Sequence, residues 1–357
     1  MRFRSSEYLV ALLQEVQAAA DRIARGDPAG IRSALPQARR DYARLSARLD
    51  ASPLTDDTAD RVDAGIAPAV AGLATGAEPV AQDGGWAHVL KLDTAATQDI
   101  AGVEYSNLLA AFDAEPAAAE AVLDDPLEAL HGLHEVICRG LAAPDVIGRA
   151  RRSAQAVHDG AQGMVLYNAP PPEALPALLD ELAVWVTEHG ESLPGVIVAG
   201  AVHERLLEWQ PFEAANGRLA RAAARVILRA RRVDRHGLAV AERLLAVDPG
   251  AYHGEVAATI RRRGDLGLWL ERYAEAVAAG LEDAAALVGP RPSAPERASA
   301  LFAELSVDGP VTVADFARAA AQPLPAARED LLALCAAGIA QRQPGSRGLR
   351  YRRAAIS

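Results

Sequence analysis

The segment from Val198 to Arg232 constrains the fold more than any other part of the chain. Apolar residues recur at helical spacing through its first half: Val198, Val202, Leu206 and Trp209. A short turn, QPFEAA, follows, and then the sequence NGRLARAAARVILRARR. Asn216 and Gly217 tolerate left-handed backbone angles, so the second helix is expected to start at this point. The sequence therefore predicts two long helices joined by a short turn.

Composition favours helices along the whole chain. Half of the 357 residues are hydrophobic, only 4% are aromatic, and alanine runs are frequent. Alanine is the best helix former, so we expect an all-α protein with closely packed helices. The length is sufficient for two or three domains with a substantial core.

Charge and targeting signals narrow the class of protein. The net charge of -10 argues against a general nucleic-acid coat and leaves room only for a local contact. Cys138 and Cys335 lie far apart and suggest no disulfide framework. The N-terminus has no apolar signal-peptide core, and no apolar run approaches the ~18 residues of a membrane span. We expect a cytoplasmic protein without a membrane segment.

Three regions follow from the pattern of turns and breaks. Residues 1–86 read as an N-terminal region with a helical pair over 5–50 and a Gly-rich connector that reaches Trp86. Residues 87–288 form a helical core. Within it, the short apolar run Met164–Tyr167 lies between glycines and a triple proline and predicts one arm of a β-hairpin flap. A Pro-rich hinge at 289–295 ends the core.

The last region, 296–357, has the pattern of a winged helix-turn-helix, with three helices and two extended arms joined by QPGSRG. Five arginines and no acidic residue occur from Gln341 to the C-terminus: Arg342, Arg347, Arg350, Arg352 and Arg353. A wing of this kind suits DNA phosphates. The expected recognition helix offers only Arg328 beside Glu329 and Asp330, which makes it a poor reader of the major groove. Dimerisation or docking to a protein is the alternative.

The start of the second helix predicts an anion site. Free backbone N–H groups at a helix start attract anions, and Arg218 and Arg221 would flank them with charge suited to phosphate oxygens. The pattern N-G-R-x-x-R alone is a weak signal, because many ordinary helices begin in the same way.

Residues 203–221, HERLLEWQPFEAANGRLAR, resemble the Fic (Fido) family, whose signature is H-P-F-x-[D/E]-G-N-G-R-x-x-R. The segments EALHGLHEVICRGL, GRARRSAQAV and AYHGEVAATIRRRGDLG follow the family's order, so the resemblance covers about residues 87–285. It implies the Fic fold and transfer of AMP from ATP to a protein hydroxyl. In that reaction a histidine is the base, an acidic residue binds magnesium, and the loop and both arginines hold the phosphates.

The resemblance is incomplete at the positions that carry the chemistry. The phosphate-binding positions that match are Pro211, Phe212, Asn216, Gly217, Arg218 and Arg221. Gln210 stands at the base position, Ala214 at the metal-ligand position and Ala215 at the first loop glycine. A glutamine amide accepts no proton near neutral pH, and alanine cannot ligate a hard cation. If the Ala215 position needs a positive φ, the strain is ~1–2 kcal/mol.

We therefore expect a degenerate family member that binds ATP, another nucleotide or a phosphoanion, with impaired transfer and without a family-type magnesium site. A ligand-sensing transcriptional regulator that uses the winged helix is the alternative. A third hypothesis is an enzyme with altered chemistry that uses Glu213 or His203. The simpler interpretation, which we favour, is a solvated carboxylate for Glu213 and a packed helix histidine for His203. A target protein, DNA and a second copy of the chain are the partners left open.

Three further patterns have competing interpretations. TAATQDIAGVEYSNLL resembles the family's inhibitory helix, with Ala101 where the glutamate belongs and Glu104 almost a full helical turn away. Arginines recur along one stripe of the second helix and predict either a polyanion groove or ion-paired side chains: Arg218, Arg221, Arg225, Arg229 and Arg232. His131, His134 and Cys138 have spacing that could suit zinc, although no second ligand cluster accompanies them.

Overall fold

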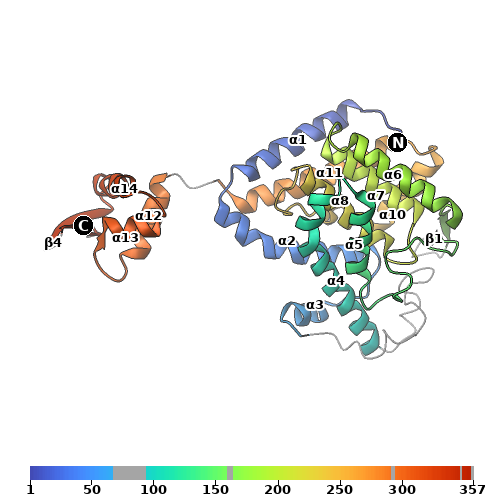
Figure 1. The fold of residues 1–357 in the computed structure, drawn as a ribbon, viewed down its shortest axis with the longest axis horizontal. Coiled ribbons are helices and arrows are strands. Elements are labelled where there is room, and N and C mark those ends of the chain that lie inside the picture. The colour runs from blue at the N-terminus through green and yellow to red at the C-terminus, as the bar shows by residue number, and fades with distance from the viewer. Residues whose placement is uncertain (67–93, 159–163, 291–293, 346–347, 355–357) are drawn as a thin grey trace. The chain divides into compact units, whose positions relative to one another are not determined.

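Figure 1 shows the computed structural model, which describes residues 1–66, 94–158, 164–290, 294–345 and 348–354. The chain divides into two compact units, Met1–Gly289 and Pro290–Ser357. The connector and the boundary expected at residue 86 lie outside the described residues. The helices that precede them pack into the same unit as the residues that follow.

The first unit is built almost entirely from helices. These are α1 (Glu7–Ala24), α2 (Pro28–Leu49), α3 (Asp56–Asp63), α4 (Thr94–Ala121), α5 (Pro126–Cys138), α6 (Leu175–His189), α7 (Gly195–Trp209), α8 (Asn216–Ala230), α9 (Glu242–Leu245), α10 (Pro249–Arg261) and α11 (Gly267–Val288), with a 3-10 turn η3 (Pro172–Ala174). The antiparallel strands β1 (Ala156–His158) and β2 (Val165–Asn168) form a hairpin. The predicted strand at Met164–Tyr167 is confirmed as β2.

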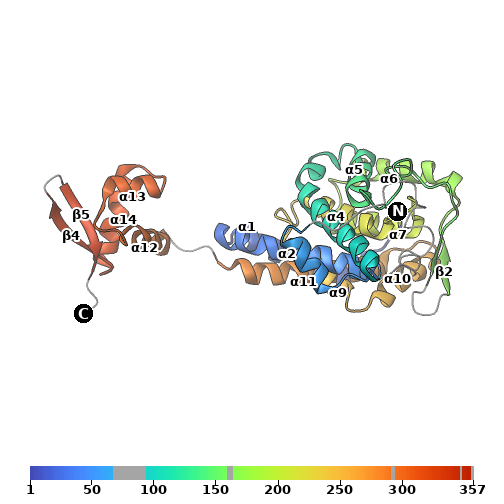
Figure 2. The same cartoon turned by 90° about the horizontal axis from the view of Figure 1, so that it is seen from below.

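The predicted helical pair over 5–50 is also confirmed, and its ends follow from local capping. The Ser6 hydroxyl accepts a hydrogen bond from the Leu9 N–H at 3.0 Å and so caps α1. Asp27 caps α2, which begins with Pro28, a residue that suits the first helical position. In Figures 1 and 2, α1 lies along α11.

Helix α7 lies at the centre of the first unit. The sequence predicts an apolar stripe, but the structure buries every residue of this helix from Gly195 to Leu207. Gly200 permits the close approach of α11, because a Cβ there would lie 2.8 Å from the Tyr273 ring and 2.9 Å from Leu270. The Trp269 indole donates to the Gly200 carbonyl at 2.7 Å. Close packing against α11 therefore fixes the middle of α7.

The second unit contains α12 (Ala294–Leu305), β3 (Val311–Thr312), α13 (Val313–Ala319), α14 (Leu324–Ala336), β4 (Ala340–Gly345) and β5 (Gly348–Arg353). Its antiparallel sheet has the order β3-β5-β4. Phe302, Phe316 and Tyr351 are buried in its core. The three predicted helices and two predicted arms are present, and β3 adds a strand that the sequence pattern did not predict. The assignment as a winged helix stays a prediction.

No helix in the described residues combines the length and apolar character needed to cross a bilayer.

Helix α7 also buries a carboxylate. Glu204 is fully buried, and Arg205 Nη1 lies 3.2 Å from its Oε2. Arg205 is shared, because it also contacts Glu208 and the Gly264 carbonyl. No described residue gives either oxygen of Glu204 a hydrogen bond. Burial raises the pKa of Glu204 to about 8.

From the buried Glu204 carboxyl we predict that the free energy of unfolding decreases as pH rises. The unfolded chain titrates Glu204 near its ordinary pKa of 4.5 and the folded protein near 8, so folding takes up a proton between these values. The free energy of unfolding should fall from this cause as pH rises through that window. Glu204→Gln is expected to raise it by about 2–4 kcal/mol at pH 8.5 and by less at pH 5, as measured by urea unfolding. The exposed Glu188→Gln is the control, and parallel pH curves for wild type and Glu204→Gln would contradict the prediction.

Candidate anion site at the start of helix α8

The turn between α7 and α8 is fixed by two left-handed residues and one asparagine. Gln210 has φ of 44° and Ala215 has φ of 62°. Asn216 Oδ1 accepts a hydrogen bond from the Phe212 N–H at 2.9 Å, and Asn216 Nδ2 donates to the Phe212 carbonyl at 2.8 Å. Ala215 therefore does adopt a positive φ, at a cost of about 1–2 kcal/mol.

Arg151 holds the turn from outside. Its guanidinium donates to the carbonyls of Gln210, Ser153 and Pro170 at 2.6, 2.5 and 2.5 Å. Its main-chain N–H donates to the Pro211 carbonyl at 2.9 Å. The side chain is almost fully buried, so its guanidinium group stabilises the backbone carbonyls of the turn. Nothing in the linear pattern singles out Arg151 or shows which carbonyls it reaches.

His134 on α5 also positions the turn. Its Nε2 lies 3.1 Å from the Ala214 carbonyl, and its ring stacks on Phe212 with a centroid separation of 4.2 Å. The Gly148 N–H donates to Nδ1, so Nε2 is the protonated nitrogen that donates to Ala214. Burial lowers the pKa of His134 to about 4, which keeps the ring neutral. Within the described residues no cluster of three or more possible ligands could hold a metal ion, so the zinc interpretation is wrong.

The two side chains considered for catalysis are engaged in local structure. The Gln210 amide donates to the Leu207 carbonyl at 2.7 Å. Glu213 accepts from Ser153 Oγ at 2.6 Å and from the Arg152 N–H at 2.7 Å. Burial alone would raise the pKa of Glu213, but these hydrogen bonds outweigh it and lower the pKa. Glu213 thus ties the 152–153 backbone to the turn.

His203 is a packed helix histidine, as the simpler interpretation predicted. It is buried, and its Nε2 lies 2.6 Å from the Tyr252 hydroxyl. Burial lowers the pKa of His203 well below its ordinary value. The same hydroxyl lies 3.5 Å from Arg221 Nη1, so His203 reaches the motif only through Tyr252.

Arg221 is fully buried, and its charge is met by the end of α2. Its Nε donates to Ser46 Oγ at 2.7 Å, and its Nη2 donates to the Ser46 carbonyl at 2.8 Å. Nη2 also lies 3.0 Å from Asp50 Oδ2. Asp50 is the C-cap residue of α2. The N-terminal helices therefore supply acceptors at the position where an anion was expected.

Arg218 contacts two carboxylates. Its Nη1 lies 2.6 Å from Glu104 Oε1 on α4, and its Nε lies 3.5 Å from Asp50 Oδ2. A Cβ built on Gly217 would lie 2.5 Å from Asp50 Oδ1, so this carboxylate rests on the first turn of α8. Asp50 thus takes the place of an external anion at the helix start, between both arginines.

The two carboxyl groups respond differently to burial. Burial alone would raise the pKa of Asp50, but Arg221 and Arg218 outweigh it and lower the pKa. For Glu104 burial is the larger effect, and its pKa is raised despite the pairing with Arg218. Asp50 is therefore the carboxylate that stays ionised over the wider pH range.

These contacts correct the interpretation of the segment around Ala101. The sequence places Ala101 where the inhibitory helix has its glutamate, and Glu104 almost a full helical turn away. In the structure Glu104, three residues later on α4, reaches Arg218. Asp50 was not considered at all, because it lies in a turn far from the motif in sequence.

The arginines further along α8 are paired inside the protein. Arg225 Nε lies 2.5 Å from Glu115 Oε1, and its guanidinium lies 4.6 Å from the Tyr42 ring centroid. Arg229 Nη2 lies 3.2 Å from Glu115 Oε2. The polyanion-groove interpretation is wrong for these positions, and the alternative of ion-paired side chains is confirmed.

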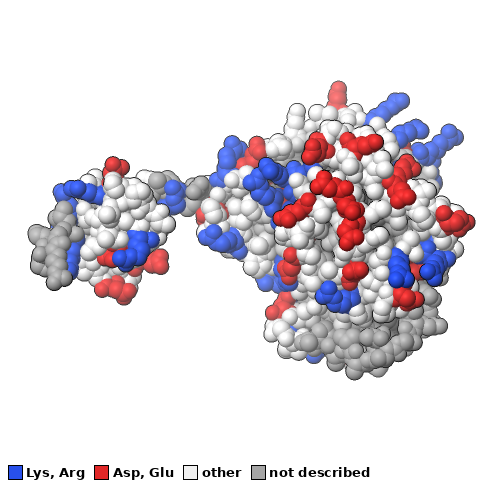
Figure 3. All heavy atoms as spheres, in the orientation of Figure 1, with Lys and Arg blue, Asp and Glu red and all other residues white. Residues whose placement is uncertain are grey.

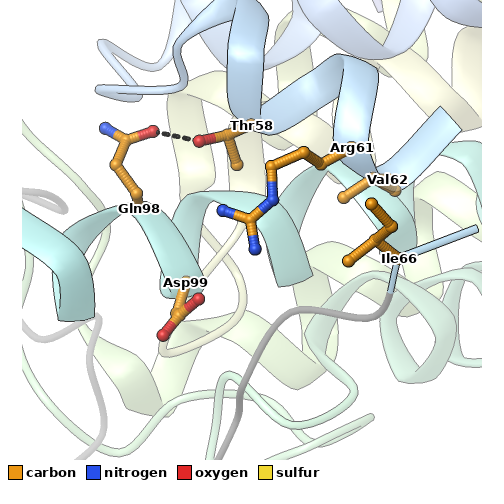
Figure 4. A pocket seen from close by; sticks show the side chains of 6 residues that line it. All are labelled: Thr58, Arg61, Val62, Ile66, Gln98 and Asp99. Carbon is orange, nitrogen blue, oxygen red and sulfur yellow. Dashed lines mark hydrogen bonds between the residues drawn. The ribbon is translucent and has the colours of Figure 1, made fainter. Parts of the chain in front are cut away.

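A shallow hollow lies between α3 and the beginning of α4 (Figure 4). Its lining residues are Thr58, Arg61, Val62, Ile66, Gln98 and Asp99. The Thr58 hydroxyl donates to Gln98 Oε1 at 2.7 Å. None of the motif residues lines this hollow, so it adds nothing to the anion site.

Comparison with known proteins agrees with this architecture. Residues 123–228 match the model of the Fic/DOC family. A search of curated proteins found no match. Three solved structures show the same fold at low sequence identity. A Fic family protein from Desulfovibrio desulfuricans G20 is 19% identical, with a TM-score of 0.60 over 99% of this chain and 98% of that one.

A variant of Fic-1 from C. elegans is 16% identical, with a TM-score of 0.52 over 78% of this chain and 72% of that one. A Fic domain containing signaling protein from Bacteroides thetaiotaomicron VPI-5482 is 15% identical, with a TM-score of 0.52 over 78% and 96%. The family-model match therefore shows a Fic/DOC domain at residues 123–228, and these neighbours show that the chain shares the fold of Fic family proteins.

Proposed function

We propose that this protein binds a phosphate-bearing ligand, with nucleotides as the leading class, at the start of α8 and is impaired in AMP transfer. The observation that carries the proposal is the Asp50 carboxylate, which lies between Arg218 and Arg221 on the first turn of the helix. The start of α8 thus has the features of an anion site, and the carboxylate of Asp50 from the same chain lies in it. A phosphate group has the charge and the acceptor oxygens to replace that carboxylate.

The chemical groups needed for transfer do not accompany this site. Gln210 cannot act as a general base, a role worth ~10²–10⁴-fold in rate, and its amide faces the Leu207 carbonyl. Ala214 offers no oxygen ligand for magnesium from its side chain. Glu213 and His203, the substitutes considered for an altered chemistry, are held by Ser153 and Tyr252. Binding without efficient transfer is the function that fits these residues.

A ligand at this site must compete with the fold. Arg221 has no exposed surface, and Asp50 is only 18% exposed. Phosphate can reach Arg221 only when Asp50 at the end of α2 moves away. The free energy gained from the ligand is therefore reduced by the cost of opening this ion pair, and weak binding is expected in the wild type.

Labelled ATP tests the transfer part of the proposal. With magnesium or manganese, the wild type should give no detectable label on itself or on lysate proteins, because the base and the metal ligand are missing. The combined variant Gln210→His, Ala214→Asp, Ala215→Gly and Asp50→Asn should gain activity. Adding Asn216→Ala to it should abolish that activity by releasing the turn. Robust labelling by the wild type that Asn216→Ala removes would contradict the proposal.

Removal of the internal anion tests the binding part. Asp50→Asn should lower the free energy of unfolding by about 3–5 kcal/mol, because Arg221 loses its buried partner. Pyrophosphate, ADP or ATP should raise the melting temperature of this variant more than that of the wild type, and calorimetry should show tighter binding. The effect should not require magnesium.

Asp113→Asn is the matched control, since Asp113 forms an exposed ion pair with Arg39 on the same unit. It should behave as the wild type. Glu104→Gln, which leaves Asp50 in place, provides a second test if Asp50→Asn folds poorly, and it should give a smaller gain in affinity. Equal ligand response in wild type, Asp50→Asn and Glu104→Gln would exclude this anion site.

A second candidate function is a ligand-sensing regulator whose C-terminal unit binds DNA. The observation that favours it is the charge of this unit. Residues 290–357 contain nine arginines and six acidic residues, although the whole chain has a net charge of -10. A locally basic unit attached to an acidic chain suits a polyanionic partner. Binding of the full-length protein to a DNA duplex, with and without ADP, tests this candidate.

A further inference from the structure

The sheet of the second unit has one face packed on the helices and one face in solvent. Cross-strand partners share a face, so the buried residues identify the inner one. Val311, Tyr351 and Ala340 are buried in the core with Phe302 and Leu331. The alternate positions form the outward face of the sheet: Thr312 on β3, Arg350 and Arg352 on β5, and Gln341 and Gln343 on β4.

The outward face presents donors at regular spacing. Arg350 and Arg352 are exposed and lie two residues apart on the central strand, which places them ~7 Å apart along it. Gln343 is paired with Arg350, and Gln341 is paired with Arg352. Arg352 Nη2 donates to Gln341 Oε1 at 3.1 Å, which holds both side chains on this face. Guanidinium and amide groups are the donors that commonly contact phosphate oxygens of nucleic acids.

Negative charge near this face is limited among the described residues. Asp315 lies close enough for Arg350 to lower its pKa, but Asp315 is held by Thr312 Oγ1 at 2.6 Å in a capping box. Arg342 on the edge strand β4 is paired with the buried Tyr351, so it belongs to the opposite face and adds no cation to the outward face. On the side of this unit that Figure 3 shows, basic side chains lie at several places with carboxylates among them.

Helix α14, the expected recognition helix, is a much weaker candidate surface. Its exposed residues include Leu324 and Leu332, which are 56% and 37% exposed, beside Arg328 and Glu329. Such a surface offers one cation, one anion and apolar groups. It supplies few of the paired donors that read base edges in the major groove.

We propose that the outward sheet face, through Arg350, Arg352 and the two glutamines, binds the phosphate backbone of a DNA duplex without sequence preference. This inference rests on the second candidate function and assigns its surface and its mode of binding. Contacts to phosphates position a protein on DNA but carry no base information, so affinity should depend on salt and not on sequence.

Fluorescence anisotropy of the full-length protein with a labelled mixed-sequence duplex tests the proposal. At low salt, Arg350→Gln with Arg352→Gln should weaken binding by about 10- to 100-fold. The slope of log affinity against log salt should fall by about 2, since two phosphate contacts are lost. A duplex of different sequence should bind equally well. The corresponding double lysine variant should retain most of the affinity, because charge is kept.

Arg318→Gln is the matched control, since Arg318 lies on α13 in the same unit with a side chain that is 81% exposed. It should change affinity less than 2-fold. If the wild type binds the duplex but Arg328→Gln weakens binding and the double variant does not, α14 is the surface and the proposal is wrong. Failure of the wild type to bind any duplex at low salt would overturn both this surface and the regulator function, whatever the outcome of the nucleotide experiments.

Discussion

The buried guanidinium of Arg221 is the interaction on which the first unit depends. A charge with no exposed surface is tolerated only when an opposite charge and hydrogen-bond acceptors surround it. These come from Ser46 and Asp50 at the end of α2 and from Tyr252 on α10. The N-terminal helices, the motif helix α8 and helix α10 must therefore meet at one point. Arg225 and Glu115 repeat the same arrangement further along α8.

The same pairing limits what the site can do. Arg218 and Arg221 hold the fold together through Asp50, so under the proposed function a phosphate ligand would have to compete with Asp50 for both arginines. The competition is reciprocal: a ligand that displaces Asp50 must loosen the end of α2, and any change that loosens α2 must favour the ligand. Around this point the turn is fixed by Arg151, His134 and Asn216. The turn is therefore held by several hydrogen bonds, whereas Asp50 and Glu104 are the groups that would move when a ligand binds.

In the second unit, the sequence predicts the order of the helices and strands but not which side chains share a surface. The three helices and the two arms followed from turn residues and periodicity. The strand β3 was not expected, because two residues give no periodic signal. The register of β4 with β5 then decided which arginines share a face: Arg350 and Arg352 point outward, whereas Arg353 turns to Ser306 and the Ala303 carbonyl. A count of arginines in the sequence could not make that distinction.

The sequence by itself determined the helices around the motif, the hairpin strand, and the residue types at positions 210 and 214, a glutamine and an alanine. These are local properties of residue type and spacing. Only the tertiary structure decided that Asp50 and Glu104 occupy the site, that Arg225 and Arg229 are internal pairs, and that Glu213 serves the backbone. The physical reason is distance along the chain: Ser46 and Arg221 are 175 residues apart, and the partner of a charge is set by which helices pack together. The sequence shows which residues are charged, but only the packing of the helices decides which charged residues pair with one another.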